Sequence, residues 1–346
     1  MSDFTPISEY FSPSPEDFHS KIRPLGQPAI LRRVCLDWPL IKKAKKGPAA
    51  LFSYLSAQET GRELQSLLAP PEVKGQFYYS ENFRTQNFEY VPQTLSAALQ
   101  DILRESAEIG SPSRYVQSVP MADYMPSVIA ENVMPYLKDV APRAWIGGET
   151  TVQTHFDPSE NIALVVMGER TATLFPPEQL SNLYPGPLET APGGVFVSTA
   201  NVEEPDFEKH PRFEKALSAA LRGKLKAGDA LYIPYGWWHH MQATAPLNML
   251  INYWWSDSRP LTNNPKAALL HAIMAFHSLQ PEERSVWQGV FERFVFRPED
   301  ETPMSHLPEE ARGMLGGLSE ADRRAAAHQL LTVLGPILGL SPPPLS

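Results

Sequence analysis

Two side chains have the types and the spacing that begin a metal site. His155 and Asp157 stand one residue apart in "THFDPSEN", directly before the apolar run "IALVV". If this segment is a strand, both side chains point to the same face, because strand residues alternate with period two. An imidazole beside a carboxylate provides two ligands for a metal ion, so the chain must supply a third.

The third ligand is expected in "GDALYIPYGWWHHMQ". This segment predicts a turn, a short buried strand and a kink at "PYG" that leads to His239 and His240. Adjacent histidines on a strand face opposite sides, so at most one of the two can join His155 and Asp157. Two histidines and one carboxylate leave three positions open on one face of an octahedral metal, which suits non-haem Fe(II).

Strand alternation also predicts a cation near the metal. If "SENIALVVMGERTATLF" forms a hairpin with a two-residue turn at Gly168 and Glu169, glycine at the first turn position fits type II′. Met167 then shares the face of His155, and Arg170 lies opposite Met167 on that face. A guanidinium there is suited to hold a carboxylate in bidentate fashion. The alternative is that Arg170 is a solvated hairpin residue.

Several motifs carry a family resemblance, namely "RYVQS", "WIGG", "HFDPSENIALVVMGERTATLFPPEQLSNLYPGP", "EEPDFEKHPRF", "GDALYIPYGWWHHM" and "NMLINYWW". Over about residues 110–256 the chain resembles the Jumonji-type (JmjC) cupin-like 2-oxoglutarate oxygenases. The likeness is greatest to the branch that contains the asparaginyl hydroxylase of hypoxia-inducible factor. The resemblance implies a mainly β double-stranded β-helix (a cupin jelly roll) flanked by helices, with His155, Asp157 and His239 as Fe(II) ligands and His240 turned outward.

The resemblance also implies a pocket for 2-oxoglutarate, which is used together with O2. Tyr115 would donate its hydroxyl to a carboxylate of this co-substrate, and Asn161 would approach its keto-acid end. In "NMLINYWW", Asn252 and Trp254 share one face by alternation and are assigned to the pocket wall. The alternative for this segment is a core strand with one satisfied amide.

The chain departs from the family pattern at two positions of this pocket. The distal carboxylate of 2-oxoglutarate normally meets a lysine, whereas this chain has Arg170, which is chemically competent to bind the same anion. Relatives place a hydroxyl three residues before the first ligand histidine, whereas this chain has Val152. Thr154, which lies nearby in the sequence, is therefore assigned to the co-substrate pocket.

The resemblance implies hydroxylation of a C–H bond, with succinate and CO2 as co-products and a protein or peptide side chain as the expected substrate. Gln117, on the face of Tyr115, is assigned to the substrate side. Asn201 is assigned there too, since it stands in the loop "FVSTANVEEPDF" where relatives often carry aspartate. The missing lysine favours two alternatives: a zinc or manganese cupin acting as an isomerase or hydrolase, and a non-catalytic dimeric cupin module.

Three regions are expected from the pattern of elements. Residues 1–110 mix short helices and strands that would pack on the barrel, and residues 111–260 contain the dense short strands of the cupin core. Residues 261–346 are helical, with apolar stripes in "KAALLHAIMAFHSL" and "EADRRAAAHQLLTVLGPILGL". Such stripes predict a homodimer formed through these helices, or else packing of the helices onto their own barrel.

Composition excludes several classes of protein. The net charge of −9 and the pI near 5.5 argue against nucleic acid as a partner, because phosphate binding needs a basic surface. Cys35 is the single cysteine, so an intrachain disulfide is excluded. No apolar run approaches the ~20 residues of a membrane-spanning helix, and the N-terminus has no signal-peptide pattern, so we expect a cytoplasmic protein.

Overall fold

The computed structural model describes residues 4–257, 265–296, 304–315 and 319–340. The chain separates into a larger compact unit, Met1–Arg259, and a second unit, Pro260–Ser346. The larger unit combines residues 1–110 with the expected cupin core, because strands from both regions hydrogen-bond into one sheet. The first two expected regions are therefore one structural body.

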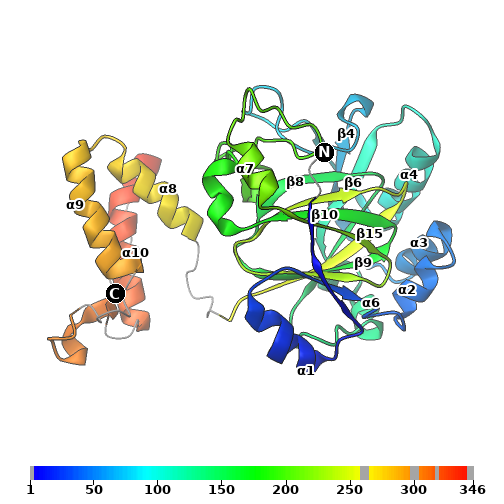
Figure 1. The fold of residues 1–346 in the computed structure, drawn as a ribbon, viewed down its shortest axis with the longest axis horizontal. Coiled ribbons are helices and arrows are strands. Elements are labelled where there is room, and N and C mark those ends of the chain that lie inside the picture. The colour runs from blue at the N-terminus through cyan, green and yellow to red at the C-terminus, as the bar shows by residue number, and fades with distance from the viewer. Residues whose placement is uncertain (1–3, 258–264, 297–303, 316–318, 341–346) are drawn as a thin grey trace. The chain divides into compact units, whose positions relative to one another are not determined.

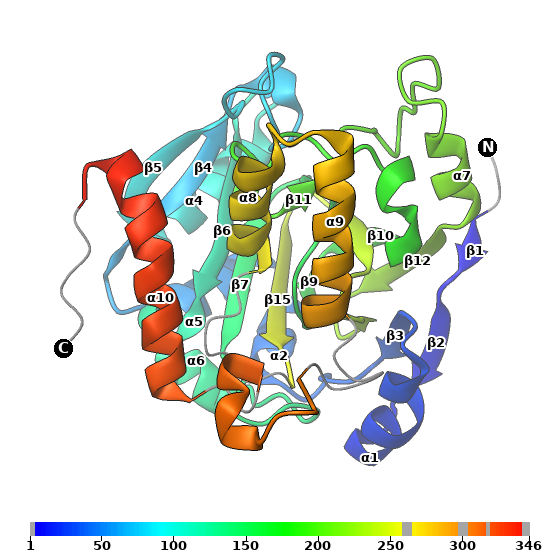
Figure 2. The ribbon, with the colours of Figure 1, turned by 90° about the vertical axis from the view of Figure 1, so that its left-hand side faces the viewer.

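Two β-sheets face each other in the larger unit (Figure 1). The small sheet has the order β1 (Thr5–Pro6), β12 (Leu221–Lys226), β10 (Glu169–Phe175), β14 (Trp238–Ala243), β8 (Thr151–Phe156) and β11 (Phe196–Val197). The large sheet has the order β2 (Ser8–Phe11), β3 (Ala29–Arg32), β13 (Ala230–Ile233), β9 (Glu160–Met167), β15 (Asn248–Trp255), β7 (Pro142–Gly147), β6 (Ser113–Pro120), β4 (Glu63–Ala69) and β5 (Glu89–Thr94). Figure 2 shows β15, β7, β6, β4 and β5 following one another across the large sheet.

The space between the sheets is filled at one side by apolar side chains from both. Ala172 and Leu174 of β10 pack there with Val165 of β9 and Leu231 of β13. Alternation explains this pattern, since every second residue of these strands points between the sheets. Two sheets packed face to face form a jelly-roll sandwich, which confirms the predicted fold class.

Helices cover the outer faces of the two sheets (Figure 1). The larger core lies between the large sheet and the helical elements η1 (Phe18–Ile22), α2 (Pro39–Ala44), α3 (Pro48–Ser56), α4 (Leu95–Ala107), α5 (Met121–Tyr124) and α6 (Pro126–Glu131). Helix α1 (Pro15–Asp17) leads into η1 and has no buried residue. The outer face of the small sheet packs against α7 (Phe213–Ser218), and η4 (Pro177–Asn182) lies against α7. Short 3-10 helices lie at η2 (Arg23–Leu25), η3 (Pro71–Val73) and η5 (Pro192–Gly194).

The connection at Gly168 crosses from one sheet to the other. β9 pairs with β13 and β15, whereas β10 pairs with β12 and β14, so the predicted β9–β10 hairpin is wrong. Gly168 has a φ of +82°, and a Cβ atom there would overlap the side-chain oxygen of Asn248. Glycine is needed because the chain turns between two sheets through a left-handed conformation.

The described part of the second unit is helical, as expected. Its elements are α8 (Pro265–Phe276), α9 (Pro281–Phe291), η6 (Glu292–Phe296), η7 (Glu309–Ala311), η8 (Gly313–Leu315), α10 (Glu320–Leu334) and η9 (Gly335–Leu338). Reciprocal capping boxes start α9 at Gln280 and α10 at Ser319. Phe276 meets Trp287 and Phe291 at ring-centroid distances of 5.7 and 5.5 Å. None of the helices described in either unit has the length and hydropathy to cross a membrane.

Candidate metal centre and cavity

Neighbouring strands of the small sheet bring the three predicted metal ligands together. His155 of β8 is directly opposite His239 of β14, and their ring centroids are 4.2 Å apart. Asp157 follows β8 at once, and its Oδ2 is 3.6 Å from Nε2 of His239. One ligand atom from each of the three residues lies within 4.8 Å of the other two. Ligand atoms at about 2.1 Å from a metal lie about 3 Å apart at right angles, so a small adjustment closes this cluster on one ion.

Backbone carbonyls orient both imidazoles for metal binding. Nδ1 of His155 lies 2.8 Å from the carbonyl oxygen of Gln153, and Nδ1 of His239 lies 3.3 Å from that of Trp237. A carbonyl oxygen only accepts, so each Nδ1 carries the hydrogen and each Nε2 keeps its lone pair for a metal. The pKa of His239 is lowered to about 4, mainly by burial and secondarily by His155, whereas Asp157 opposes this shift. His239 is therefore neutral at neutral pH, as a metal ligand must be.

A cavity of about 620 Å³ lies beside the triad between the two sheets. Six residues assigned from the sequence to the co-substrate or substrate line it together with the three ligands: Tyr115, Gln117, Asn161, Arg170, Asn252 and Trp254. Its apolar wall includes Val152, Met241 and Leu250. The volume is ample for a five-carbon diacid next to a metal ion.

Arg170 is a buried cation without an anionic partner in the part of the chain that the structure describes. It is 2% exposed, and its Nε and Nη2 atoms have no hydrogen-bond acceptor among the described residues. It enters the cavity from β10, where it is paired with Ala243 of β14. Ala243 and His239 are four residues apart on β14, so about 13 Å of strand separates the position of Arg170 from the triad. Burying an unpaired charge is costly, so this site is suited to an anion that reaches from Arg170 toward the metal.

Tyr115 faces Arg170 across the cavity. Burial raises the pKa of Tyr115 and lowers the pKa of Arg170, and the interaction between the two side chains opposes both shifts. The Tyr115 ring stacks on Phe77 with centroids 5.5 Å apart and lies opposite Gly147 of β7. A Cβ atom at Gly147 would come within 2.8 Å of Cδ2 of Tyr115, so the glycine of "WIGG" provides the space for this ring.

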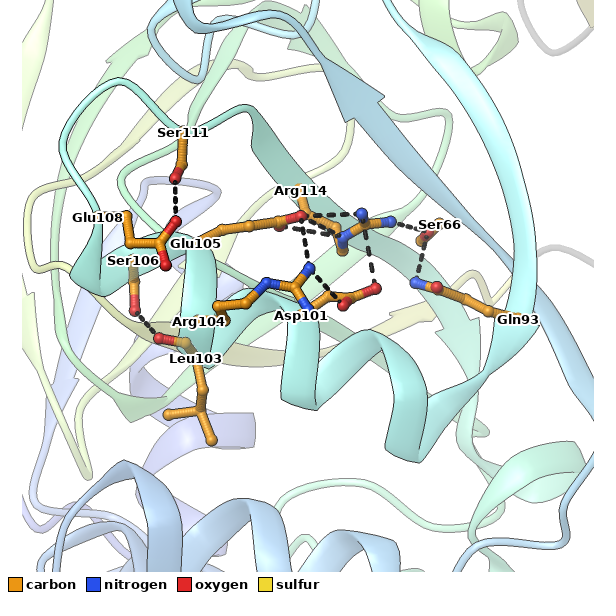
Figure 3. Close-up of polar contacts among 10 residues, drawn as sticks. All are labelled: Ser66, Gln93, Asp101, Leu103, Arg104, Glu105, Ser106, Glu108, Ser111 and Arg114. Atoms are coloured by element: carbon orange, nitrogen blue, oxygen red, sulfur yellow. Dashed lines mark hydrogen bonds and ion pairs between the residues drawn. The ribbon is translucent and has the colours of Figure 1, made fainter.

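Arg114, the residue before Tyr115, anchors β6 through the face of the strand opposite to that of Tyr115. Its Nη2 lies 2.9 Å from Oε1 of Glu105 and 3.6 Å from Oδ2 of Asp101, both on α4. Figure 3 shows these carboxylates on one side of the Arg114 guanidinium and Ser66 of β4 on the other. Because neighbours on a strand point to opposite faces, this largely buried ion pair holds the strand that directs Tyr115 into the cavity.

Three side chains of the large sheet complete the polar lining near the triad. Oδ1 of Asn161 is buried and has no donor among the described residues, so it remains available to a bound molecule. Oδ1 of Asn252 accepts a hydrogen bond from Nε1 of Trp145 at 2.7 Å. Nε1 of Trp254 donates to Oδ2 of Asp157 at 3.0 Å, which orients that metal-binding carboxylate.

Two residues assigned from the sequence lie outside the cavity, which corrects their predicted contacts. Thr154 precedes His155 and points to the opposite face of β8, where it is fully buried. A bulge between β8 and β14 instead places Val152 on the cavity side, opposite Met241. The side chain of Asn201 forms a hydrogen bond within its own loop, where its Oδ1 accepts from the backbone N–H of Glu203 at 2.9 Å.

His240 points away from the cavity, as the resemblance implied, but it does not reach solvent. It is 1% exposed, lies opposite Thr173 of β10, and its Nε2 is 3.8 Å from Oε1 of Glu203. Burial, and secondarily Arg222, lowers the pKa of His240 to about 3. His240 is therefore a neutral packing residue beneath the outer surface of the small sheet.

Several cavity residues were missed from the sequence, among them Arg143, Trp145, Tyr78 and Met241. Arg143 and Trp145 alternate in the strand "RAWIG", so they share one face, as period two requires. This alternation predicts that Arg143 and Trp145 line the cavity together. Tyr78 comes from the segment between β4 and β5, whose place beside the cavity depends on tertiary packing.

A family model described as a cupin-like domain matches residues 15–260. This chain belongs to the JmjC-type cupin-like family. Jumonji C domain-containing protein 5 of Drosophila melanogaster is 26% identical over 254 residues, covering 72% of this chain and 59% of the relative. HSPB1-associated protein 1 of Homo sapiens is 27% identical over 262 residues, covering 69% of this chain and 50% of the relative.

Lysine-specific demethylase JMJ31 of Arabidopsis thaliana is 34% identical over 118 residues, covering 34% of this chain and 21% of the relative. The chain thus spans about half the length of the curated relatives it matches, or less. The family is known for Fe(II)- and 2-oxoglutarate-dependent oxygenases, which include demethylases and hydroxylases. The His–Asp–His cluster of this JmjC-type chain agrees with that chemistry.

Proposed function

We propose that this protein is an Fe(II)- and 2-oxoglutarate-dependent hydroxylase that oxidises a C–H bond of a protein side chain. The observation that supports this most directly is the buried, unpaired Arg170 in the same cavity as the triad His155, Asp157 and His239. A metal site alone is compatible with many cupins. A metal site in the same cavity as a buried, unpaired guanidinium favours an anionic co-substrate, and a dicarboxylate fits both ends.

The chain's own residues divide the work of holding the reactants. The triad would hold a ferrous ion through two neutral imidazoles and one carboxylate, leaving open positions for ligands. Arg170 and the hydroxyl of Tyr115 would bind the distal carboxylate of 2-oxoglutarate. Trp254 keeps the Asp157 carboxylate in place through its hydrogen bond, and the amide N–H of Asn161, which lines the same cavity, would donate to the keto-acid end.

When bound, the ferrous ion supplies the redox chemistry that couples O2 to both substrates. The reaction balances as a four-electron reduction of O2. Oxidative decarboxylation of 2-oxoglutarate gives two electrons, and hydroxylation of the substrate C–H bond gives the other two. One oxygen atom ends in succinate and the other in the new C–O–H group, while the lost carboxylate leaves as CO2. The apolar wall formed by Val152, Met241 and Leu250 would keep bulk water away from this chemistry.

The test is anaerobic addition of Fe(II) and 2-oxoglutarate to the purified protein. We expect the visible metal-to-ligand charge-transfer band of a chelated 2-oxo acid, and slow succinate formation once O2 is admitted. The Asp157→Ala variant is the matched control and should show neither. A protein that binds zinc or manganese in the triad but gives no band with Fe(II) and 2-oxoglutarate would be the cupin isomerase or hydrolase instead.

We also propose that the second unit associates with a second copy of the chain. Large apolar side chains on its helices remain exposed, including Val286, Trp287 and Val333 at 68%, 46% and 61%. Light scattering coupled to gel filtration should give twice the chain mass of 38.6 kDa. Val286→Glu should yield monomers, whereas Gln288→Glu, which adds the same charge on exposed α9, should leave the dimer intact. A monomeric parent protein would contradict this proposal.

A further inference from the structure

Arg143 is a second cation in the cavity, placed on the large sheet. It lies on β7 next to Asn252 of β15, and it is part of the cavity wall. Its guanidinium carbon is 5.9 Å from the ring centroid of Trp254. The same indole donates to Oδ2 of Asp157 at 3.0 Å. One indole ring therefore separates Arg143 from a metal ligand.

The known contacts of Arg143 leave part of its guanidinium unused. Nε donates to Oγ of Ser118 at 2.7 Å, and Nη2 donates to the carbonyl oxygen of Ser118 at 2.6 Å. Ser118 has a φ of +53° at a bulge where the register between β6 and β7 shifts. No described residue accepts a hydrogen bond from Nη1, and the side chain is only partly buried. An arginine presents donors in a planar fork, so a free Nη1 is a recognition group.

The charges of the cavity wall are unbalanced toward positive. Asp157 is the single acidic side chain among the described residues that line the cavity, and it is committed to the metal. Arg170 is matched to the co-substrate. Arg143 and the neutral amide of Gln117, which lines the same cavity, then remain for the substrate. A cationic substrate side chain would meet a like charge without a carboxylate to offset it, which is unfavourable in a partly buried site.

We infer that the substrate is an acidic side chain, aspartate or glutamate, of a protein or peptide, whose carboxylate binds Arg143 beside the C–H bond that is oxidised. This inference rests on the proposed hydroxylase function and names its substrate class. It excludes methylated lysine and arginine as preferred substrates. The free edge of the guanidinium holds the carboxylate, the Gln117 amide adds a donor, and the Trp254 indole lies between that carboxylate and the metal.

The test uses matched pools of short random peptides that differ only in the central residue: Asp, Glu, Asn, Gln, Lys, Arg or trimethyllysine. The Fe(II)-loaded protein receives 2-oxoglutarate and O2 with each pool. Succinate formation is measured together with the peptide mass change, which is a gain of one oxygen for hydroxylation and a loss of CH2, released as formaldehyde, for demethylation. We expect the Asp or Glu pool to stimulate turnover at least ten-fold over the Lys, Arg and trimethyllysine pools. Stimulation by a basic pool overturns the inference, as does turnover that is equal across all pools. Free aspartate and glutamate form a separate arm, and turnover with these alone overturns the protein part of the inference.

Variants separate recognition by Arg143 from a merely structural role. Arg143→Gln should reduce the preference for the Asp pool over the Asn pool at least ten-fold, and Arg143→Lys should keep most of it. Ser118→Ala removes one contact of the guanidinium but not its charge, so it should retain the preference. Arg62→Gln, an equal charge change outside the cavity wall, should behave as the parent. Equal loss in the Ser118 and Arg143 variants would mean that Arg143 only supports the bulge.

Failure of this inference is distinguishable from failure of the proposed function. If the charge-transfer band and slow succinate formation occur without peptide, the oxygenase function stands and the pools test substrate class alone. If the band is absent in the parent protein, the proposed function itself is wrong, and the substrate inference that rests on it is overturned as well.

Discussion

The two sheets that enclose the cavity carry different kinds of functional residue. The small sheet presents two of the candidate metal ligands, His155 and His239, and the cation Arg170. The third candidate ligand, Asp157, directly follows strand β8 of this sheet. The large sheet contributes mainly hydrogen-bonding and aromatic groups, among them Tyr115, Asn161, Asn252 and Trp254, and one cation, Arg143. The comparison indicates that the small sheet determines which reaction is available, while the large sheet orients the groups that take part. Variants on the two sheets should therefore differ in size of effect.

The largest effect is expected for Asp157→Ala, which removes the charged ligand of the triad. Fe(II) affinity should fall at least ~100-fold, and 2-oxoglutarate turnover should become undetectable, because two imidazoles alone hold the metal weakly. Metal titration and succinate assays on the folded variant check this. Removing the metal from the parent protein with a chelator should have the same effect on turnover, reversed by Fe(II). Equal turnover in variant and parent would remove the basis of the site assignment.

Arg170 should show opposite effects on activity and stability. Arg170→Met should raise KM for 2-oxoglutarate by about 10- to 100-fold, the value of one charge-assisted hydrogen-bonded contact. The same variant should melt at the same temperature or higher in the absence of 2-oxoglutarate, because it replaces a buried unpaired charge with an apolar side chain. Arg170→Lys should keep most of the affinity. A strong loss of stability in Arg170→Met would show that the guanidinium is a structural group.

Trp254→Phe tests the orienting role of the large sheet. The change keeps the aromatic ring but removes the hydrogen bond from Nε1 to Asp157. We expect about 10-fold weaker Fe(II) binding, at the low end of the range for groups that orient a ligand. The position of the charge-transfer band should also shift, which loss of packing alone would not cause. An effect as large as that of Asp157→Ala would break the distinction between the two sheets.

The smallest effect is expected for Tyr115→Phe. It removes one neutral hydroxyl opposite Arg170 while keeping the stacking on Phe77. KM for 2-oxoglutarate should rise about 5-fold, corresponding to ~1 kcal/mol, with little change in Fe(II) affinity. Double-mutant analysis with Arg170→Lys measures the coupling between the two side chains. Additive effects would indicate that the two groups do not bind the same carboxylate.

The Arg170 and Thr154 assignments show how far strand alternation can be trusted. The predicted hairpin at Gly168 is wrong, but Arg170 still lines the cavity, because either sheet of a sandwich directs alternate side chains inward. The assignment of Thr154 to the co-substrate pocket is wrong, because closeness in sequence to His155 does not decide the face of the strand on which a side chain lies. Its immediate neighbour His155 faces the cavity, so Thr154 must face away. The bulge that brings Val152 to the inner face is a local irregularity that period two does not contain.

The amino-acid sequence by itself determined the ligand types, their spacing and the faces on which they lie, because the period of a strand is a property of the local backbone. It also identified Tyr115, Asn161, Asn252 and Trp254 for the cavity, through motifs and alternation. Only the tertiary structure decided that β9 and β10 belong to different sheets, that Arg170 has no anionic partner among the described residues, and that Arg143 lies one indole from Asp157 of the triad. Those facts depend on distances between segments far apart in the chain, and such distances arise only when the two sheets pack.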